Sequence, residues 1–524
     1  MFEKIKTFDS FITKYIRKWD EFFTPDRIII ASILLMIFHS IYSLSFNYHI
    51  YRDVAGVYAW YARDFGNGVW HDIPISKVPP LNIFLGGLLV RCGIEAYKSV
   101  MLLSLLFMLL TIFPLRKLLS LFCTPKAAAY GCLLWVMAPK ILRFAGTGLL
   151  ESTRDFFLIT AFYLLFKSWT SKSKWYNWLL LGAASAGLIL ARGEGIIMCF
   201  MLMIGLLIRP ISDYKSIKLL WQNIIKPLLI TGIVCLAILS PALLKNYKVT
   251  GYPVTDARMI GVIKLIPVVN TFFTPVQTEI QQEKDVRLLP HVRKNIPYSA
   301  DNGKRAKRIV SNFIRGAYEL YFFLALVGII AMIKLHQWRK EYSFIIAYVI
   351  LVSSTFIFFA VSHRYFIFAV PLFMVFTLKA LEIISNFAEK HNIKYLFLCL
   401  FGLIILLQPL NAWLWMCDKS DSDELYVKDY IAAHRKNFSH IPANRKLIIH
   451  ADTPLIFRSD EDRLFHYGEY VPDVKYITGF DILFVEKKKK KDVADCLARK
   501  DLRLFDDNFH SFMVFVPNRK NDNK

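Results

Sequence analysis

Acidic residues at two places in the chain could transfer a proton at the edge of an apolar segment. Asp53 follows the apolar run that ends at Phe46, within the aromatic stretch "YHIYRDVAGVYAWYARDFGNG". A carboxylate there could accept the proton of an incoming hydroxyl and so act as a general base. Glu151 and Asp155, in "GLLESTRDFF", are four residues apart and share one face of a helix. The ordinary alternatives are a simple loop acid for Asp53 and helix-start acids paired with Arg154 for the other two.

Basic residues in three further motifs could bind a phosphate group. Arg192 lies in "LARGEG", Arg364 lies in "VSHRYF", and Lys77 comes shortly before a Pro-Pro pair. The planar guanidinium fork matches phosphate oxygens, whereas a lysine ammonium supplies a point charge. Such donors stabilise the negative charge that develops on a phosphate leaving group. The alternative for each is an anchor at the membrane interface. Our candidates for binding substrate or phosphate are Lys77, Arg192, Arg364, Tyr365, Arg52 and Asp155.

The sequence has no pattern typical of a metal or nucleotide site. The eight cysteines are scattered singly without a CxxC pair, and the histidines are isolated. There is no GxxxxGK[ST] loop and no GxGxxG motif within a strand–helix–strand unit. We therefore predict no metal ligands and no certain cofactor, and the sequence leaves a divalent metal as an open alternative.

Long apolar segments must position these residues. The chain of 524 residues is 55% hydrophobic, with a mean hydropathy of +0.39. A membrane span needs about 20 predominantly apolar residues, so the ten at 81–90 predict an interfacial or re-entrant helix instead. The prediction is an all-α polytopic membrane protein with about eleven transmembrane helices plus juxtamembrane helices. The predicted spans are 28–46, 99–115, 127–142, 147–166, 175–191, 195–208, 227–244, 317–333, 342–361, 365–384 and 395–416.

The charge distribution predicts the orientation of these spans. The formal charge is +24, and the residues from 418 onward hold 20 Lys and Arg against 19 Asp and Glu. The excess therefore belongs to the membrane part, where short loops rich in Lys and Arg stay cytoplasmic. This places the N-terminus inside and the loops 47–98 and 245–315 outside. Because the positive charge is distributed among membrane loops, we do not expect this protein to bind nucleic acid.

The chain divides into two predicted domains. Residues 1–417 form the transmembrane domain, and residues 418–524 form a small soluble α/β domain on the extracytoplasmic side. The strands of the second domain are predicted at "KLIIHAD", "DILFVE" and "SFMVFVPN", and a helix at Ser422–Asn437, which has an acidic first turn.

Five motifs follow one another in an order that resembles a known family. They are "YRDVAGVYAWYARDFGNG" with "PPLNIF", then "GLLESTRDFFLITAFYL", "GLILARGEG", "SPALLKNYKVTGYPV" and "HRYFIFAVPL". In this order they resemble the glycosyltransferase C superfamily. The resemblance is closer to its branch of dolichyl-phosphate-mannose protein mannosyltransferases and lipid A aminoarabinose transferases. It extends from about Asp53 to Leu372.

The resemblance implies roles for individual residues. Asp53 matches the first-loop acid that is regarded as the catalytic base or the group that orients the acceptor. Glu151 matches the acid of the second outward loop, usually Asp in relatives, and Arg364 with Tyr365 matches an "RY" before a late span. Lys77 is one position from the Lys that relatives often have directly before the Pro-Pro. Some relatives bind a divalent metal, for which this sequence shows no matching ligands.

The implied function is that of a membrane glycosyltransferase, a hexosyl- or pentosyltransferase that uses a lipid-linked donor. It would move a sugar from a polyprenyl-phosphate carrier to a hydroxyl of a lipid, glycan or protein at the extracytoplasmic face of the cell membrane. In this hypothesis Asp53 deprotonates or orients the acceptor, Glu151 assists, and a single displacement inverts the anomeric carbon. The expected partners are this donor, the acceptor and membrane lipids. The alternatives are a glycan ligase or polymerase that uses a lipid-diphosphate donor, and a lipid or solute transporter.

Overall fold

The computed structural model describes the greater part of the helical region and the core of a small sheet. The described residues are 22–45, 54, 58–68, 79–170, 174–208, 220–250, 252–255, 302–356, 363–391, 402–403, 405–410, 413, 448–451, 463–466, 482–487, 490–507 and 512–517.

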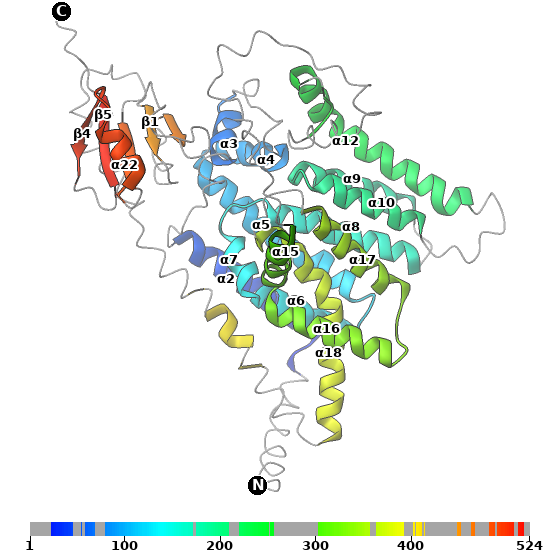
Figure 1. Ribbon diagram of the computed structural model, residues 1–524. Coiled ribbons are helices and arrows are strands. Elements are labelled where there is room, and N and C mark those ends of the chain that lie inside the picture. Colours follow the sequence, from blue (N-terminus) through cyan, green and yellow to red (C-terminus); the bar gives the residue numbers. More distant parts are fainter. Residues whose placement is uncertain are drawn as a thin grey trace, which may run out of the picture.

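Helices make up the first and larger part of the molecule (Figure 1). In chain order they are α2 (Pro25–Ser45), α3 (Ala59–Gly66), α4 (Pro80–Arg91), α5 (Ala96–Leu119), α6 (Pro125–Met137), α7 (Pro139–Ala145), α8 (Glu151–Thr170), α9 (Trp175–Ala191), α10 (Gly195–Leu207), η2 (Trp221–Ile225), α12 (Lys226–Thr250), α15 (Asn302–Gly316), α16 (Glu319–Lys334), α17 (Lys340–Thr355), η5 (His363–Phe368) and α18 (Ala369–Lys390).

Several of these helices can cross a membrane. Within the described residues, four helical segments have the length and apolar composition of a span. They are Pro25–Tyr42, Ala96–Leu119, Trp221–Lys248 and His363–Lys390. A fifth is formed if α16 is taken together with the end of α15, to which it is joined by a bend of 94°. The predicted spans 175–191 and 195–208 form the shorter apolar helices α9 and α10, and most of 395–416 lies outside the described residues.

Local sequence explains where helices begin and break. The Oγ1 atom of Thr124 accepts a hydrogen bond from the backbone N–H of Ala127, at 3.3 Å, and Pro125 follows at the first helical position. The predicted span 127–142 is divided into α6 and α7 at Pro139, whose missing N–H cannot continue the helical hydrogen bonds. Helix α4 has 12 residues and is therefore about 18 Å long, too short to cross the hydrocarbon layer.

Small residues allow neighbouring helices to approach closely. Gly328 of α16 lies against the backbone carbonyl of Phe376 in α18, where a Cβ atom would overlap the oxygen. Gly187 of α9 similarly faces the ring of Phe157 in α8. Such close approaches are typical of membrane helices, which gain stability from packing and not from leaving water.

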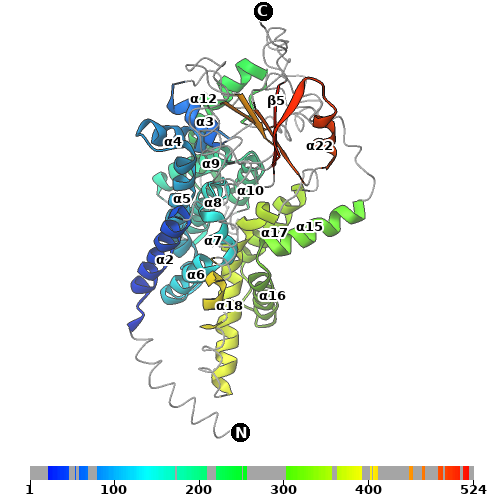
Figure 2. The same ribbon diagram turned by 90° about the vertical axis from the view of Figure 1, so that its left-hand side faces the viewer.

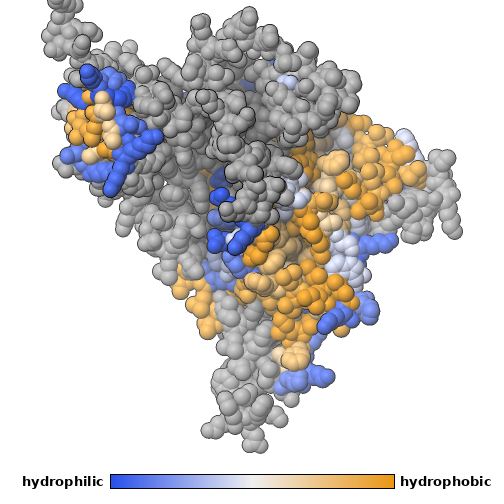
Figure 3. All heavy atoms as spheres, viewed as in Figure 1, coloured by the Kyte–Doolittle hydropathy of each residue, from blue (hydrophilic) through white to orange (hydrophobic). Residues whose placement is uncertain are grey.

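The outer surface of this helical body is largely hydrophobic. In the space-filling view, hydrophobic side chains cover much of the exposed helical surface, whereas the small sheet has a mixed surface (Figure 3). The exposed apolar residues include Leu180, Phe200, Leu236 and Phe323, with exposed fractions between 53% and 65%. A surface of this kind suits contact with lipid.

A five-stranded mixed sheet follows the helices. Its strands are β1 (Ile448–Ala451), β2 (Arg463–His466), β3 (Ile482–Glu486), β4 (Leu502–Asp506) and β5 (Phe512–Pro517), in the order β2-β1-β3-β5-β4. β1 pairs in parallel with β2 and β3, and β5 pairs antiparallel with β3 and β4. Helix α22 (Lys490–Leu497) packs on the sheet through Cys496, which shares a core with Leu483, Val485 and Phe515.

The sheet agrees with the predicted strands. "KLIIHAD", "DILFVE" and "SFMVFVPN" contain β1, β3 and β5, and the predicted helix Ser422–Asn437 lies outside the described residues. The sheet lies beyond the end of the helical body that holds α3 and α4, away from the C-terminal end of α18 (Figures 1 and 2).

Candidate functional site

The site begins at the turn before α8. Gly148 has a φ angle of +73°, a conformation that favours glycine, and α8 starts three residues later at Glu151. A Cβ atom on Gly148 would lie 3.0 Å from Cγ1 of the buried Val54. The turn before α8 therefore lies against Val54, in the segment that follows the first apolar span.

The first turns of α8 bury three charged side chains. Glu151 is 1% exposed, and Arg154 and Asp155 are fully buried. A buried charge is tolerated only when it is paired, because removal from water costs several kcal/mol. The partners come from two other parts of the chain.

Arg192 lies in the turn that follows α9, between two carboxylates. Its Nη1 atom donates to Oε1 of Glu151 at 2.5 Å, and its Nε atom contacts Oε1 of Glu194. Arg364, at the start of η5, places its Nε atom 3.7 Å from the same oxygen of Glu151. One carboxylate oxygen therefore joins α8, the turn after α9, and η5.

Arg154 forms a second pair in the same place. Its Nε atom donates to Oδ1 of Asp155 at 2.8 Å, and its Nη1 atom donates to the backbone carbonyl of Tyr365 at 3.1 Å. The same Nη1 atom lies 3.8 Å from Oε1 of Glu194. Arg154 thus holds η5 against α8 through a backbone contact that does not depend on the side chain of Tyr365.

The ring of Tyr365 lies close to the guanidinium groups of Arg192 and Arg364. The guanidinium carbon of Arg192 lies 4.8 Å from the ring centroid, and that of Arg364 lies 5.4 Å from it. The ring is stacked on Phe356, at 5.6 Å between centroids and 23° between planes. Cations at this distance from an aromatic ring are attracted to its face.

These residues form one charge cluster, which we define as Glu151, Asp155, Glu194, Arg154, Arg192 and Arg364. Its three acids and three arginines balance in formal charge. Arg364 has the most exposed side chain of the six, at 16%, against 10% for Glu194 and 6% for Arg192. Among the described residues, Oε2 of Glu151 and Oδ2 of Asp155 accept no hydrogen bond although both atoms are buried. The cluster therefore has a cation at its most exposed side and, on the neighbouring Glu151, a buried carboxylate oxygen that accepts no hydrogen bond.

The structure brings together five of the residues predicted from the sequence. Helix α8 supplies two of them, the turn after α9 one and η5 two, namely Glu151, Asp155, Arg192, Arg364 and Tyr365. Asp53, Arg52 and Lys77 lie outside the described residues. Tyr58, directly before α3, is close enough to Arg192 to affect its electrostatics, so the described part of the first loop lies near the cluster.

Sequence reasoning did not include Arg154 and Glu194 among the candidates. Arg154 was expected only as an ordinary partner of a helix-start acid, and Glu194 was part of the quoted "LARGEG" motif. The signal that could have identified them is a charged residue within an apolar segment, because such residues need a buried partner. The identity of that partner depends on packing.

No metal site is seen in the described part of the chain. Across the described ranges, no three His, Cys, Asp or Glu side chains are grouped so that they could hold an ion. The carboxylates of the charge cluster are each occupied by arginine on at least one oxygen.

Comparison with known proteins identifies the fold. No protein-family model and no curated protein matches this sequence. ArnT from Cupriavidus metallidurans bound to undecaprenyl phosphate is similar, with a TM-score of 0.55 and 12% identity over 93% of this chain and 97% of that chain. The archaeal oligosaccharyltransferase AglB from Archaeoglobus fulgidus, in complex with an inhibitory peptide and a dolichol-phosphate, is also similar. Its TM-score is 0.54, at 12% identity over 90% of this chain and 70% of that chain. The predicted resemblance is thereby confirmed at the level of the fold, which the chain shares with these two proteins.

Proposed function

We propose that this chain, with its glycosyltransferase C fold, is a membrane enzyme that moves a sugar from a polyprenyl-phosphate carrier to a hydroxyl acceptor. The reaction takes place at the extracytoplasmic face. Two similar structures support this proposal, because one holds undecaprenyl phosphate and the other a dolichol-phosphate. The observation that carries it is the meeting of arginines and acids from α8, the turn after α9, and η5 in one buried cluster.

The carrier phosphate binds at Arg364. This side chain is the most exposed of the cluster, and its guanidinium fork can donate two parallel hydrogen bonds to phosphate oxygens. Arg192 is held between Glu151 and Glu194, so it contributes positive charge from a more buried position than Arg364. Lys77 and Arg52, outside the described residues, are further candidate ligands.

The acceptor is activated by carboxylates from two segments. Asp53 accepts the proton of the acceptor hydroxyl, and the unused Oε2 of Glu151 orients that hydroxyl. The contact between Val54 and the Gly148 turn supports this arrangement, because each position is close in sequence to one of the two acids.

The reaction is a single displacement. The acceptor oxygen forms a bond with the anomeric carbon while the bond between that carbon and the phosphate oxygen breaks. The electron pair of the broken bond stays on the polyprenyl phosphate, and the proton goes to Asp53. Attack from the side opposite the leaving phosphate inverts the anomeric centre.

The test uses the substitution Asp53→Asn in isolated membranes supplied with a polyprenyl-phosphate sugar carrying a radioactive label. Loss of a positioned general base lowers the rate by about 10² to 10⁴ fold. Asp64→Asn, a change of the same kind on α3, is the matched control and keeps the wild-type rate. Transfer by Asp53→Asn at the rate of the control would remove Asp53 from the mechanism. Monophosphate and diphosphate donors, compared side by side, separate this function from that of a ligase.

A further inference from the structure

Helix α15 combines basic and apolar residues. Its sequence, "NGKRAKRIVSNFIRG", has no acidic residue. Basic residues are interleaved with the apolar side chains of Ile309, Val310, Phe313 and Ile314. The basic residues are Lys304, Arg305, Lys307, Arg308 and Arg315. A basic amphipathic helix of this kind is typical of a membrane surface.

The bend between α15 and α16 orients α15 along a membrane surface. The axes of its last part, from Lys307 to Gly316, and of α16 meet at 94°. Tyr318 lies in the bend with a φ angle of +63°. Since α16 is apolar and exposes Phe323 and Ile330 on its outer face, it suits the hydrocarbon layer, and α15 then runs nearly parallel to the membrane plane. Figure 2 shows α15 extending outward from the top of α16.

One face of α15 packs on the protein. The ring of Phe313 lies 5.5 Å from that of Phe366 in η5, and Gly316 lies against the backbone carbonyl of His363. This face therefore holds η5, which carries Arg364. At 3.6 residues per turn, the side of the helix opposite Ile309, Phe313 and Gly316 is the side of Lys307 and Ile314.

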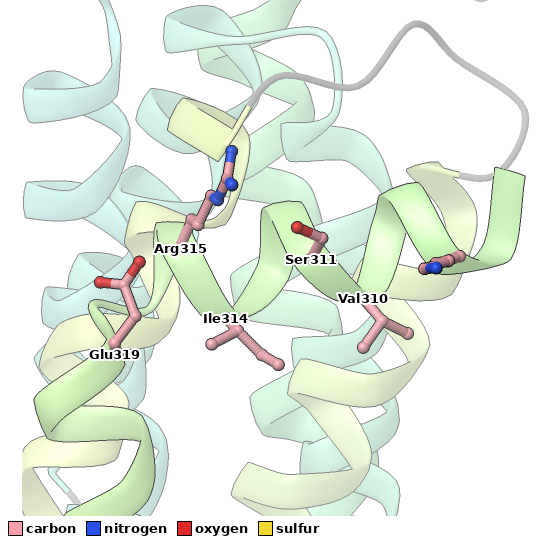
Figure 4. A pocket seen from close by; sticks show the side chains of 6 residues that line it. Val310, Ser311, Ile314, Arg315 and Glu319 are labelled. Carbon is pink, nitrogen blue, oxygen red and sulfur yellow. The ribbon is translucent and has the colours of Figure 1, made fainter. Parts of the chain in front are cut away.

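The opposite face forms a groove of about 500 Å³ with the start of α16. Its lining combines two cations, one acid and two apolar side chains, and consists of Lys307, Val310, Ser311, Ile314, Arg315 and Glu319. Val310 and Ile314 point to one side of α15, whereas Arg315 points to the other, with Glu319 on the neighbouring helix (Figure 4). The groove thus has an apolar part and a positively charged part.

We propose that this groove binds an anionic phospholipid of the surrounding membrane. The acyl chains lie along Val310 and Ile314, and the phosphate lies between Lys307 and Arg315, with the exposed Arg308 adding charge. The single acid of the lining, Glu319, leaves the groove net positive. Since the groove faces away from η5 and the charge cluster, its occupant is a bulk lipid and not the sugar donor.

The experiment measures lipid binding to the full-length protein in detergent by native mass spectrometry, with phosphatidylglycerol and phosphatidylcholine as probes. The test variant is Lys307→Gln/Arg308→Gln/Arg315→Gln. Each basic residue near an anionic lipid contributes about a factor of five, so the variant binds phosphatidylglycerol roughly 100-fold more weakly. The control variant, with the same loss of charge on the sheet side, is Lys487→Gln/Lys490→Gln/Lys491→Gln, and it binds like the wild type.

Three results would overturn the proposal. They are equal binding by the test and control variants, equal binding of phosphatidylcholine by the wild type, and displacement of phosphatidylglycerol by equimolar undecaprenyl phosphate. If the test variant fails to fold, the wild-type protein is labelled with a photoreactive phosphatidylglycerol instead. Labelling then falls on peptides from α15 and the start of α16, and labelling elsewhere contradicts the assignment. Because sugar transfer is not measured, these outcomes do not depend on the proposed enzymatic function.

Discussion

The substitution Arg364→Ala tests the phosphate site most directly, because the structure predicts a loss of rate without a loss of folding. Glu151 keeps Arg192 at 2.5 Å when Arg364 is removed, so the substitution leaves no buried carboxylate without a cation. The side chain of Arg364 is also the most exposed of the charge cluster, so its loss removes less buried packing than the loss of Arg154 or Arg192 would. We therefore expect normal membrane insertion and only a small fall in unfolding temperature.

The size of the effect follows from the charge on the phosphate. The phosphodiester of the donor carries one negative charge, and the released polyprenyl phosphate carries about −1.5 to −2 at pH 7. An arginine on the phosphate therefore interacts more strongly with the transition state than with the bound donor. Removing one side chain that donates hydrogen bonds to the phosphate raises the activation free energy by about 3 kcal/mol, or roughly 150-fold in kcat. The KM for the sugar donor rises as well. Arg364→Lys keeps the charge but loses the planar fork, so its loss of rate is smaller.

The assay measures initial rates of sugar transfer by purified protein against the concentration of a polyprenyl-phosphate sugar. Arg503→Ala, an exposed arginine on β4, is the matched control for the loss of one charge. If Arg364→Ala gives values of kcat and KM like those of the control at equal protein level, Arg364 does not bind the phosphate. A large fall in unfolding temperature would instead show that its role is structural.

Three further variants test packing inside the protein, two of them in the charge cluster and one between α16 and α18. Arg154→Met leaves Asp155 buried without its cation and costs about 3–5 kcal/mol, whereas Arg154→Met/Asp155→Leu recovers part of this loss. Thermal unfolding of both variants is followed with a dye that reacts with the buried thiols, and a double variant that is no more stable than Arg154→Met would show that the two residues are not coupled. Gly328→Val forces a side chain onto the carbonyl of Phe376 and destabilises the protein by about 1–3 kcal/mol, measured by the same unfolding assay, and an unchanged unfolding temperature would contradict this close contact.

The amino-acid sequence by itself determined the helical class, three of the five strands of the sheet and the positions of the motifs. Apolar runs of sufficient length must leave water as helices in a membrane, and period-two patterns such as "DILFVE" predict strands. It also indicated four of the six residues of the charge cluster, because an ionisable side chain at the end of an apolar segment is costly unless it has a role.

Only the tertiary structure decided which charges meet. Arg192 and Glu151 are 41 residues apart, and Arg154 and the carbonyl of Tyr365 are 211 residues apart. No local pattern specifies contacts across such separations, because they follow from the packing of α8 against α9 and η5. Packing also decides that Arg154 pairs with its neighbour Asp155, whereas Glu151 receives Arg192 and Arg364 from other parts of the chain. The sequence specifies which residues are charged, and the packing of the helices selects their partners.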